Sequence, residues 1–388
     1  MENQIHVKER SCGAPDLGAL LDWYEKNRRI LPWREDPTPY HVWLSEIMLQ
    51  QTRVEAVRGY YLRFLETLPD IASLAAAKED VYLKLWEGLG YYSRVRNLHK
   101  GAATVMEEYG GELPHTAAEL CSIPGIGPYT AAAIASIAFG ECVPAIDGNL
   151  LRVFARLTAY GKDIKSESAK KAARAYYLAA MQGLSPEESH AAGISRYGDV
   201  NQALMDLGAA VCLPNAQPLC GQCPFRDHCA AHAKGAETAF PVMPEKKARK
   251  VEDRTVFLIH DADRIALRKR PAKGLLAGLY EYPNTDGSLT EQEAIAYVRR
   301  LGFSPLHIRR LPDSKHLFTH KEWHLRGYEI LADELEEYRP GSEEPGSIFL
   351  AAIPEIRDTW SVPSAFAAYT DRILGEPADG GGNRGRKR

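Results

Sequence analysis

One glutamate stands in one of the most apolar stretches of the chain. Glu46 lies in the segment YHVWLSEIMLQQT, and apolar neighbours surround it, namely Trp43, Leu44, Ile47 and Met48. If this part of the helix is buried, loss of solvation raises the pKa of the carboxyl group and keeps it protonated near neutral pH, as a general acid requires. An ordinary glutamate on an exposed helix face is the alternative.

A second carboxylate, Asp147, immediately precedes the helical segment GNLLRVFARL. Its simplest role is to cap that helix, and the amides and dipole of a helix N-terminus stabilise a charged carboxylate. We therefore expect Asp147 to remain ionised and to face a developing cation, with Asn149 placed to orient it or the substrate. Two carboxyl groups in contrasting environments suit cleavage through an oxocarbenium-like transition state, in which one protonates the leaving group and the other stabilises the sugar cation.

Four of the seven cysteines follow the pattern C-x7-C-x2-C-x5-C; they are Cys212, Cys220, Cys223 and Cys229. Zinc sites usually pair two CxxC turns, whereas this pattern contains one. Four thiolates in so compact a loop suit a cubane 4Fe-4S cluster, which we prefer to zinc. A redox CxxC is disfavoured because the flanking sequence is not of the βαβ type.

Two glycines, Gly125 and Gly127, lie in the segment IPGIGPYTAAAI between helical stretches. Glycine permits the positive φ of a tight turn and a close approach of the backbone to a ligand, and the following helix N-terminus presents free amides. Phosphate is the natural partner of such a turn. A plain turn between two helices is the alternative on these residues alone.

The elements that must position these residues are of two kinds. Apolar residues recur every three or four positions through most of the segment 17–231, which predicts a helical domain over residues 1–231. Two prolines and a Lys/Arg cluster indicate a linker over 232–252. Residues 253–370 mix strand alternation with one helical stretch, EQEAIAYVRRL, which predicts a smaller α+β domain. We expect the Gly-rich, basic residues 371–388 to be a disordered tail.

The composition is that of a globular protein. Of 388 residues, 45% are hydrophobic and 26% are charged, and the formal net charge of -3 neither suggests nor excludes DNA binding. The N-terminus lacks the apolar core of a signal peptide, so we expect a cytoplasmic protein. The uncharged segment 121–140 is interrupted by prolines and glycines, which argues against a membrane span and predicts a short buried helix.

Several motifs together resemble the MutY-type adenine DNA glycosylases, which belong to the helix-hairpin-helix, or endonuclease III, superfamily. They are LPWR at 31–34, LSEIMLQQT at 44–52, WEGLGYYSR at 86–94, IPGIGPYTA, VPAIDGNLLRV and the four cysteines. The resemblance spans residues 17–365. It implies a mainly α catalytic domain of two helical lobes with an iron-sulfur loop, followed by an α+β Nudix-like domain.

The resemblance also implies catalytic roles. Glu46 would protonate the adenine N7 and later assist water, while Asp147 would stabilise the oxocarbenium ion, supported by Tyr129 and Asn149. Bifunctional members of the superfamily carry a lysine where this chain has Tyr129. Since lysine forms a Schiff base with the sugar and a phenol cannot, the resemblance predicts a monofunctional glycosylase that leaves an abasic site.

The implied partner is duplex DNA that contains adenine opposite 8-oxoguanine or, less efficiently, guanine, with the adenine flipped out of the stack. Gln51 and Tyr91 match positions that wedge into the duplex. The residues that we expect at the DNA are Arg34, Gln51, Thr52, Tyr91, Gly125 and Gly127. We expect the chain to act as a monomer and to have no membrane partner.

The second domain resembles a Nudix fold through GLLAGLYEYP at 274–283, but no REXXEE run follows, so the metal cage for pyrophosphate hydrolysis is missing. In the family this domain recognises 8-oxoguanine with a Phe-Ser-His loop, and this chain has Phe318, Thr319 and His320. A second departure is the first cysteine spacing, which is seven residues here and six in the family.

Two rival interpretations start from the same residues. A bifunctional thymine-glycol-type glycosylase/lyase is opposed by Tyr129 and by the extra domain. A DNA-binding iron-sulfur or zinc module that has lost its chemistry is opposed by the joint presence of Glu46 and Asp147.

Overall fold

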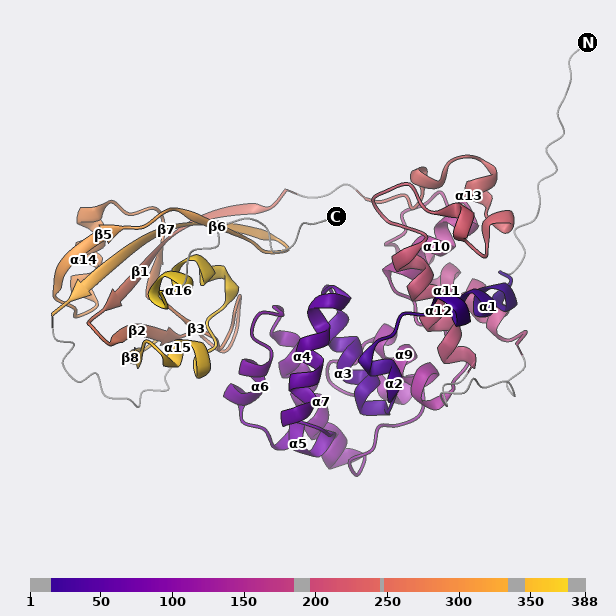
Figure 1. Cartoon of the computed structure of the whole chain (residues 1–388), viewed down its shortest axis with the longest axis horizontal. Coiled ribbons are helices and arrows are strands. Elements are labelled where there is room, and N and C mark those ends of the chain that lie inside the picture. Colours follow the sequence, from indigo (N-terminus) through magenta and orange to yellow (C-terminus); the bar gives the residue numbers. More distant parts are fainter. Residues whose placement is uncertain (1–14, 185–195, 245–247, 334–345, 376–388) are drawn as a thin grey trace, which may run out of the picture. The chain divides into compact units, whose positions relative to one another are not determined.

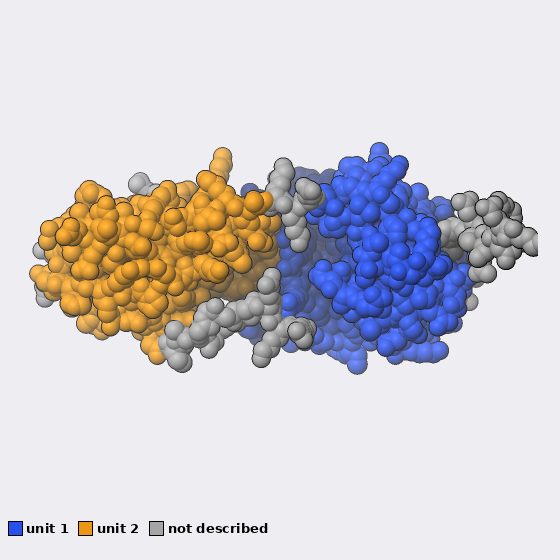
Figure 2. Space-filling model, turned by 90° about the horizontal axis from the view of Figure 1, so that it is seen from above, with its two compact units in different colours: residues 1–76, 97–245 blue, residues 77–96, 246–388 orange. Residues whose placement is uncertain are grey.

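The computed structural model describes residues 15–184, 196–244, 248–333 and 346–375. The chain forms two compact units, one of residues 1–76 and 97–245 and the other of residues 77–96 and 246–388 (Figure 2). Residues 77–96 lie inside the segment that we expected to form a single helical domain. In the structure they group with the second unit.

The part of the chain before residue 240 is helical where it is described. Its α-helices are α1 (Leu17–Asn27), α2 (Pro32–Glu35), α3 (Pro39–Leu49), α4 (Val54–Thr67), α5 (Ile71–Ala76), α6 (Glu79–Leu85), α7 (Ser93–Glu108), α8 (Ala117–Leu120), α9 (Pro128–Phe139), α10 (Gly148–Leu157), α11 (Glu167–Met181), α12 (Arg196–Ala210) and α13 (Ala230–Ala233). Two short 3-10 helices lie among the clustered cysteines, η1 (Cys220–Gln222) and η2 (Arg226–His228), and a third, η3 (Glu237–Ala239), lies inside the segment 232–252 that we expected to be a linker.

Two groups of helices make up the first unit. Helices α3 and α9 are apolar on nearly all sides, as expected of central buried helices, and they pack against each other (Figure 1). The second group has its own core, to which α1, α10, α11 and α12 contribute side chains such as Leu20, Phe154, Tyr177 and Leu204. Helix α1 therefore packs beside α12, which is far away in sequence.

The second unit contains the strands. They are β1 (Lys250–His260), β2 (Arg264–Lys269), β3 (Tyr280–Glu281), β4 (Asn284–Asp286), β5 (Pro305–Arg310), β6 (Ser314–Leu317), β7 (Lys321–Ala332) and β8 (Ile348–Ala352). The described strands form one mixed sheet, in the order β3-β2-β1-β7-β5, with β4 paired to β1, β6 to β7 and β8 to β2. Strands β1 and β7 run parallel, and the other pairs are antiparallel.

Strand β1 shows how helices cover both faces of this sheet (Figure 1). Val256 and Leu258 contribute to a core that includes η4 (Ser364–Phe366) and α16 (Ala367–Ile373), while Phe257 and Ile259 contribute to a core with α14 (Glu291–Arg300). Alternate residues of a strand point to opposite faces, so a run of apolar residues is buried on both sides. A short helix, α15 (Glu355–Asp358), follows β8.

The mainly helical first part and the mixed second part match the fold class that the sequence predicts. Helix α16 continues through Ile373, into the segment 371–388 that we expected to be a disordered tail. Residues 376–388 of that segment lie outside the described residues. Among the described residues, no helix is both long enough and apolar enough to cross a membrane.

Candidate active site

Glu46 lies on α3 and is almost fully buried, with 6% of its surface exposed. The hydroxyl of Tyr129, in the first turn of α9, donates a hydrogen bond of 2.5 Å to Glu46 Oε2. The two residues meet because α3 and α9 pack against each other. The exposed alternative for Glu46 is therefore wrong.

Burial raises the pKa of Glu46 from 4.5 to about 7. The hydrogen bond from Tyr129 and the charge of Arg34 oppose this rise, whereas the nearby carboxylate of Asp147 adds to it. Desolvation disfavours the charged form, and it outweighs the stabilising contacts here. The carboxyl group therefore exchanges a proton near neutral pH, which is the property that a general acid/base needs.

Asp147 is the N-cap of α10, as the sequence predicts. Its Oδ1 accepts a hydrogen bond of 2.7 Å from the Leu150 amide, and its Oδ2 accepts one of 2.8 Å from Asn149 Nδ2. Burial nevertheless raises the pKa of Asp147, in spite of these donors. Our expectation that the cap alone would favour the charged form is therefore incomplete, because it neglected the loss of solvent around the carboxylate.

Two buried side chains position Asp147. Asn201 accepts a hydrogen bond of 2.9 Å from the Ala145 amide and donates one of 2.9 Å to the Val143 carbonyl, which ties the preceding loop to α12. Arg152 donates to Asn149 Oδ1 at 2.8 Å and to the Cys212 carbonyl at 2.8 Å. Asp147, Asn149, Arg152 and the cysteine loop are thus joined by consecutive hydrogen bonds.

One cavity of about 350 Å³ brings most of the expected site residues together. Its lining includes Arg34, Glu46, Gln51, Thr52, Tyr129, Asp147 and Asn149. The cavity has the size of a small-ligand pocket, and both carboxyl groups face it. Gly125, Gly127 and the cysteines do not line it.

Sequence reasoning missed two polar residues of α12 at this site. Gln202 lines the cavity with 4% of its surface exposed, and its amide nitrogen has no hydrogen-bond partner among the described residues. Asp206 accepts hydrogen bonds from Arg34 at 2.8 and 3.0 Å and from Arg29 Nε at 2.7 Å. Their spacing of four residues, one helical turn, within the largely apolar segment VNQALMDLGA was the available signal.

The two expected wedge residues share an unusual backbone conformation. Gln51 has a φ of 57° and Tyr91 a φ of 49°, and both are exposed. Such left-handed conformations are costly for residues with a Cβ and concentrate at functional sites. In the second unit the Tyr91 hydroxyl lies 2.6 Å from Thr319 Oγ1.

Phe318, Thr319 and His320 form the turn between the antiparallel strands β6 and β7. Phe318 packs edge-on against the buried Trp323, with ring centroids 4.8 Å apart, whereas Thr319 and His320 are exposed. The turn is thus anchored by one aromatic side chain and presents a hydroxyl and an imidazole to its surroundings.

The two glycines before α9 differ in conformation. Gly125 has a φ of 86°, and a Cβ there would lie 2.8 Å from the Cβ of Asn97. Gly127 has the extended conformation of an N-cap, and a Cβ there would meet no atom within 4 Å. Glycine is therefore required by the backbone at Gly125, while the space beside Gly127 leaves the first amides of α9 accessible.

The four clustered cysteines line a second cavity, together with the apolar side chains of Val153, Leu157 and Phe225. Arg156 donates to Cys212 Sγ at 3.1 Å and to the Leu213 carbonyl at 2.9 Å. A thiolate-bound cluster carries net negative charge, and this guanidinium lies where it would compensate that charge. The donor set and its surroundings therefore fit an iron-sulfur cluster.

Comparison with known proteins agrees with this geometry. Residues 44–177 match the model of the HhH-GPD superfamily of base excision DNA repair proteins, and residues 255–370 match the NUDIX domain. The adenine DNA glycosylase of Homo sapiens is 36% identical over 78% of this chain and 64% of its own length. That of Mus musculus is 34% identical over 81% of this chain and 70% of its own length. The chain belongs to the adenine DNA glycosylase family.

In this member of the adenine DNA glycosylase family, the segment that matches the HhH-GPD model contains Glu46, Tyr129 and Asp147. The segment that matches the NUDIX model contains the loop at 318–320. Among solved structures, a thermostable thymine-DNA glycosylase is 26% identical over 56% of this chain and 95% of its own, with a TM-score of 0.49. The chain spans 64% of the length of the human adenine DNA glycosylase.

Proposed function

We propose that this chain hydrolyses the N-glycosidic bond of adenine mispaired with 8-oxoguanine, and less efficiently with guanine, in duplex DNA. The observation that carries the proposal is the shared cavity of Glu46, with its pKa of about 7, and Asp147. Cleavage of a glycosidic bond needs a proton for the leaving base and a negative group beside the sugar cation. Membership of the adenine DNA glycosylase family supports adenine as the base.

In the proposed reaction Glu46 gives its proton to the adenine N7. The bond between C1′ and N9 then breaks with its electron pair on the base, and the carboxylate of Asp147 faces the oxocarbenium ion that remains. Glu46, now ionised, takes a proton from water, whose oxygen adds to C1′. Tyr129 holds the Glu46 carboxyl group by its hydrogen bond, and Asn149 holds Asp147.

Adenine reaches this cavity only after it leaves the stack, because the glycosidic bond is shielded in a paired duplex. The unpartnered amide nitrogen of Gln202 and the guanidinium of Arg34 lie in the cavity wall, where they would bond ring nitrogens of the flipped base. A buried donor without a partner is costly, so a base that satisfies it is favoured.

The product would be an abasic site. The hydroxyl of Tyr129 is buried and occupied by Glu46, and a phenol forms no Schiff base with the sugar. The described lining of the cavity contains no lysine. This supports a monofunctional enzyme.

The turn at Gly125 and Gly127 would hold DNA through hydrogen bonds from backbone amides to phosphate. Gln51 and Tyr91 would each wedge into the duplex, and Thr52 would contact the DNA. The loop Phe318-Thr319-His320 would read 8-oxoguanine on the opposite strand. Its exposed hydroxyl and imidazole can donate to and accept from the groups that distinguish the damaged base. Thr319 carries a methyl group beyond the serine of the family, and its hydroxyl already reaches Tyr91.

Cys212, Cys220, Cys223 and Cys229 would hold a 4Fe-4S cluster. The cluster would cross-link a segment that has little regular structure of its own. Arg152, which bonds both the Cys212 carbonyl and Asn149, would then keep the order of this loop coupled to the position of Asp147.

The test uses duplexes with adenine opposite 8-oxoguanine, guanine or thymine, incubated with the full chain and scored for strand breaks with and without alkali. We expect alkali-dependent breaks at adenine, fastest opposite 8-oxoguanine. Breaks without alkali would favour the bifunctional alternative, and equal rates with all three partners would refute the assigned specificity.

A further inference from the structure

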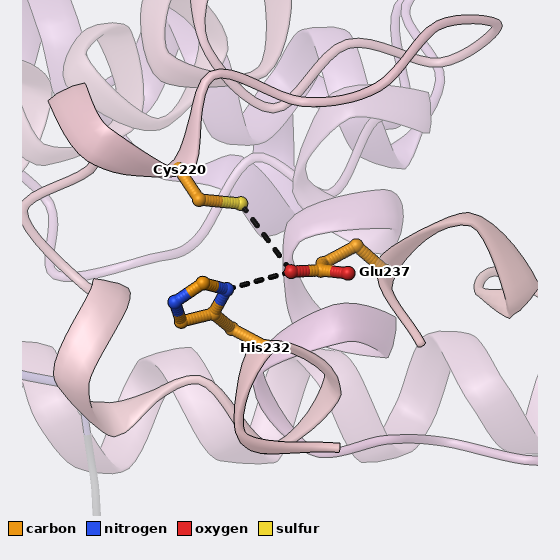
Figure 3. Close-up of side chains that lie close together, drawn as sticks. All are labelled: Cys220, His232 and Glu237. Atoms are coloured by element: carbon orange, nitrogen blue, oxygen red, sulfur yellow. Dashed lines mark hydrogen bonds and ion pairs between the residues drawn. The ribbon is translucent and has the colours of Figure 1, made fainter. Parts of the chain in front are cut away.

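Charged side chains outside the cavity of the two carboxyl groups differ in what they hold. His232 Nδ1 lies 2.6 Å from Glu237 Oε1 and forms an ordinary hydrogen-bonded pair with it, beside Cys220 (Figure 3). Arg94 instead holds a turn of the backbone, between α6 and α7, and with it the aromatic ring of Tyr91.

The turn between α6 and α7 contains three residues with a left-handed backbone. Gly88 has a φ of 95°, Gly90 one of 71° and Tyr91 one of 49°. This conformation is costly mainly where a Cβ is present, so Tyr91 needs contacts that hold it there. Two hydrogen bonds supply part of them: the Leu89 amide donates to the Trp86 carbonyl at 3.1 Å, and Trp86 Nε1 donates to the Gly90 carbonyl at 3.1 Å.

Arg94 lies in the first turn of α7, and its side chain reaches back to the preceding turn. The residue is only 9% exposed, and its Nη2 donates to the Leu89 carbonyl at 3.2 Å and to the Gly90 carbonyl at 3.1 Å. The guanidinium carbon lies 5.2 Å from the centroid of the Trp86 ring and 5.6 Å from that of the Tyr91 ring. A guanidinium is attracted to the faces of aromatic rings, most strongly where water is excluded. Arg94 thus contacts both the backbone of the turn and the Tyr91 ring.

Arg94 keeps its charge in a place where charge is costly. Burial lowers the pKa of Arg94 from 12.5 to about 10, so the guanidinium remains charged at neutral pH. A buried charge is favourable only where its partners replace the lost water. The two carbonyl groups and the two rings are such partners, and a hydrocarbon side chain could replace none of these hydrogen bonds.

Tyr91 is 46% exposed, and its hydroxyl lies 2.6 Å from Thr319 Oγ1. One part of the ring is therefore packed on Arg94, while the rest faces the surroundings. A side chain that must be ordered before it binds loses affinity. We propose that Arg94 is a positioning residue for the wedge: its guanidinium holds the turn and the Tyr91 ring in the orientation that separates the target adenine from the neighbouring base. The inference rests on the proposed function, in which Tyr91 enters the duplex.

The experiment compares the full-length wild type with Arg94→Met, Arg94→Lys and Tyr91→Ala, and with double variants that combine Tyr91→Ala with each change of Arg94. Arg96→Gln is the matched control, because Arg96 lies on the same helix and donates to Glu79 Oε1 at 2.8 Å instead of to the turn. The substrate is a duplex with adenine opposite 8-oxoguanine and the fluorescent base 2-aminopurine beside that adenine. The rise in fluorescence on mixing reports unstacking, and single-turnover excision reports the chemical step.

Methionine keeps the length and the apolar stem of arginine but removes the donors and the charge. We expect Arg94→Met to reduce the fluorescence rise and to lower the excision rate about tenfold, since one hydrogen bond from a charged donor is worth at least that factor. Arg94→Lys should show most of the same loss, because an ammonium group lacks the planar fork that stacks on rings and bonds two carbonyls. Arg96→Gln should behave as the wild type.

Each double variant should be no slower than Tyr91→Ala alone, because a residue that acts through the Tyr91 ring has no further effect once the ring is gone. A role in folding alone would instead lower the melting temperature and leave the rates of the folded variants unchanged. Circular dichroism checks folding, and Arg94→Lys with its double variant serves if Arg94→Met is unfolded.

Three results would overturn the proposal. They are wild-type unstacking and excision by the folded Arg94 variants, double variants slower than Tyr91→Ala by the full effect of the Arg94 change, and Arg94→Lys equal to the wild type, which would mean that only the charge is needed. A wild type that unstacks the probe through Arg94 and Tyr91 without excising adenine would uphold the wedge and refute the proposed reaction. A wild type that neither unstacks the probe nor excises adenine would refute both.

Discussion

The burial of Glu46 predicts that one substitution changes catalysis and stability in opposite directions. Glu46→Gln keeps the size of the side chain and an oxygen that accepts the Tyr129 hydrogen bond, but it removes the titrating proton. Loss of general acid/base catalysis typically lowers a rate by about 10² to 10⁴. We therefore expect excision of adenine to collapse in the variant.

The same change should stabilise the fold above neutral pH. The pKa of Glu46 rises from 4.5 to about 7 on folding, so the folded state holds the proton more tightly than the unfolded state. The contribution of this carboxyl group to the stability of the wild type is then fully present below about pH 4.5 and is lost as the pH rises through about 7. The difference between a pKa of 4.5 and one of about 7 corresponds to roughly 3 kcal/mol of stability, which the glutamine variant would recover at pH 8.

The assay is thermal unfolding of the full chain by circular dichroism at pH 5 and pH 8, beside single-turnover excision. For a unit of this size, about 2 to 4 °C accompany each kcal/mol, so the melting temperature at pH 8 should rise by roughly 6 to 12 °C. At pH 5 the gain should be less than about 1 kcal/mol. Glu66→Gln, an exposed change on α4, should alter neither quantity.

Two results would refute this reasoning. If the Gln variant melts at the wild-type temperature or lower at pH 8, desolvation of the carboxyl group is not the dominant influence on its pKa. If the variant excises adenine at the wild-type rate, Glu46 is not the proton donor.

Four further predictions follow from the same geometry. Tyr129→Phe removes a hydrogen bond that lowers the pKa of Glu46, so the high-pH fall in excision rate should move to higher pH; an unmoved pH-rate profile contradicts the assignment. Borohydride should trap little wild-type complex but should trap Tyr129→Lys, and strong wild-type trapping would indicate a lyase. Replacing Thr319 and His320 by alanine should bring excision opposite 8-oxoguanine down toward the rate opposite guanine, by up to about tenfold per contact; equal loss on both substrates would mean a general role in folding or DNA binding. The purified chain should be brown with about four iron and four sulfide per molecule, and Cys121→Ser should keep that colour; stoichiometric zinc without sulfide would reject the cluster.

Features that depend on near neighbours could be read from the sequence. Asp147 was predicted to cap α10, and its carboxylate does accept from the Leu150 amide, because a cap joins residues three positions apart. The strand alternation over residues 254–270 and the helical spacing of EQEAIAYVRRL are likewise local patterns, and the structure has β1, β2 and α14 there. The resemblance of short motifs then indicated the family, which the comparisons show.

Other features exist only because distant segments meet. Tyr129 reaches Glu46 across 83 positions, and Asp206 reaches Arg34 across 172. The grouping of residues 77–96 with the second unit has no counterpart in composition or periodicity. Gln202 gained its significance only when the structure showed its amide nitrogen buried in the cavity wall without a partner among the described residues.

The sequence by itself determined which chemical groups are present and how each is held by its own turn of chain: two carboxyl groups, one helix cap, four thiols and a positive-φ glycine at Gly125. Only the tertiary structure decided how acidic those groups are. Burial raises the pKa of both Glu46 and Asp147, although Asp147 has the local donors that lower it. The reason is that a hydrogen bond involves one neighbour, whereas desolvation depends on every packed segment that excludes water from the group.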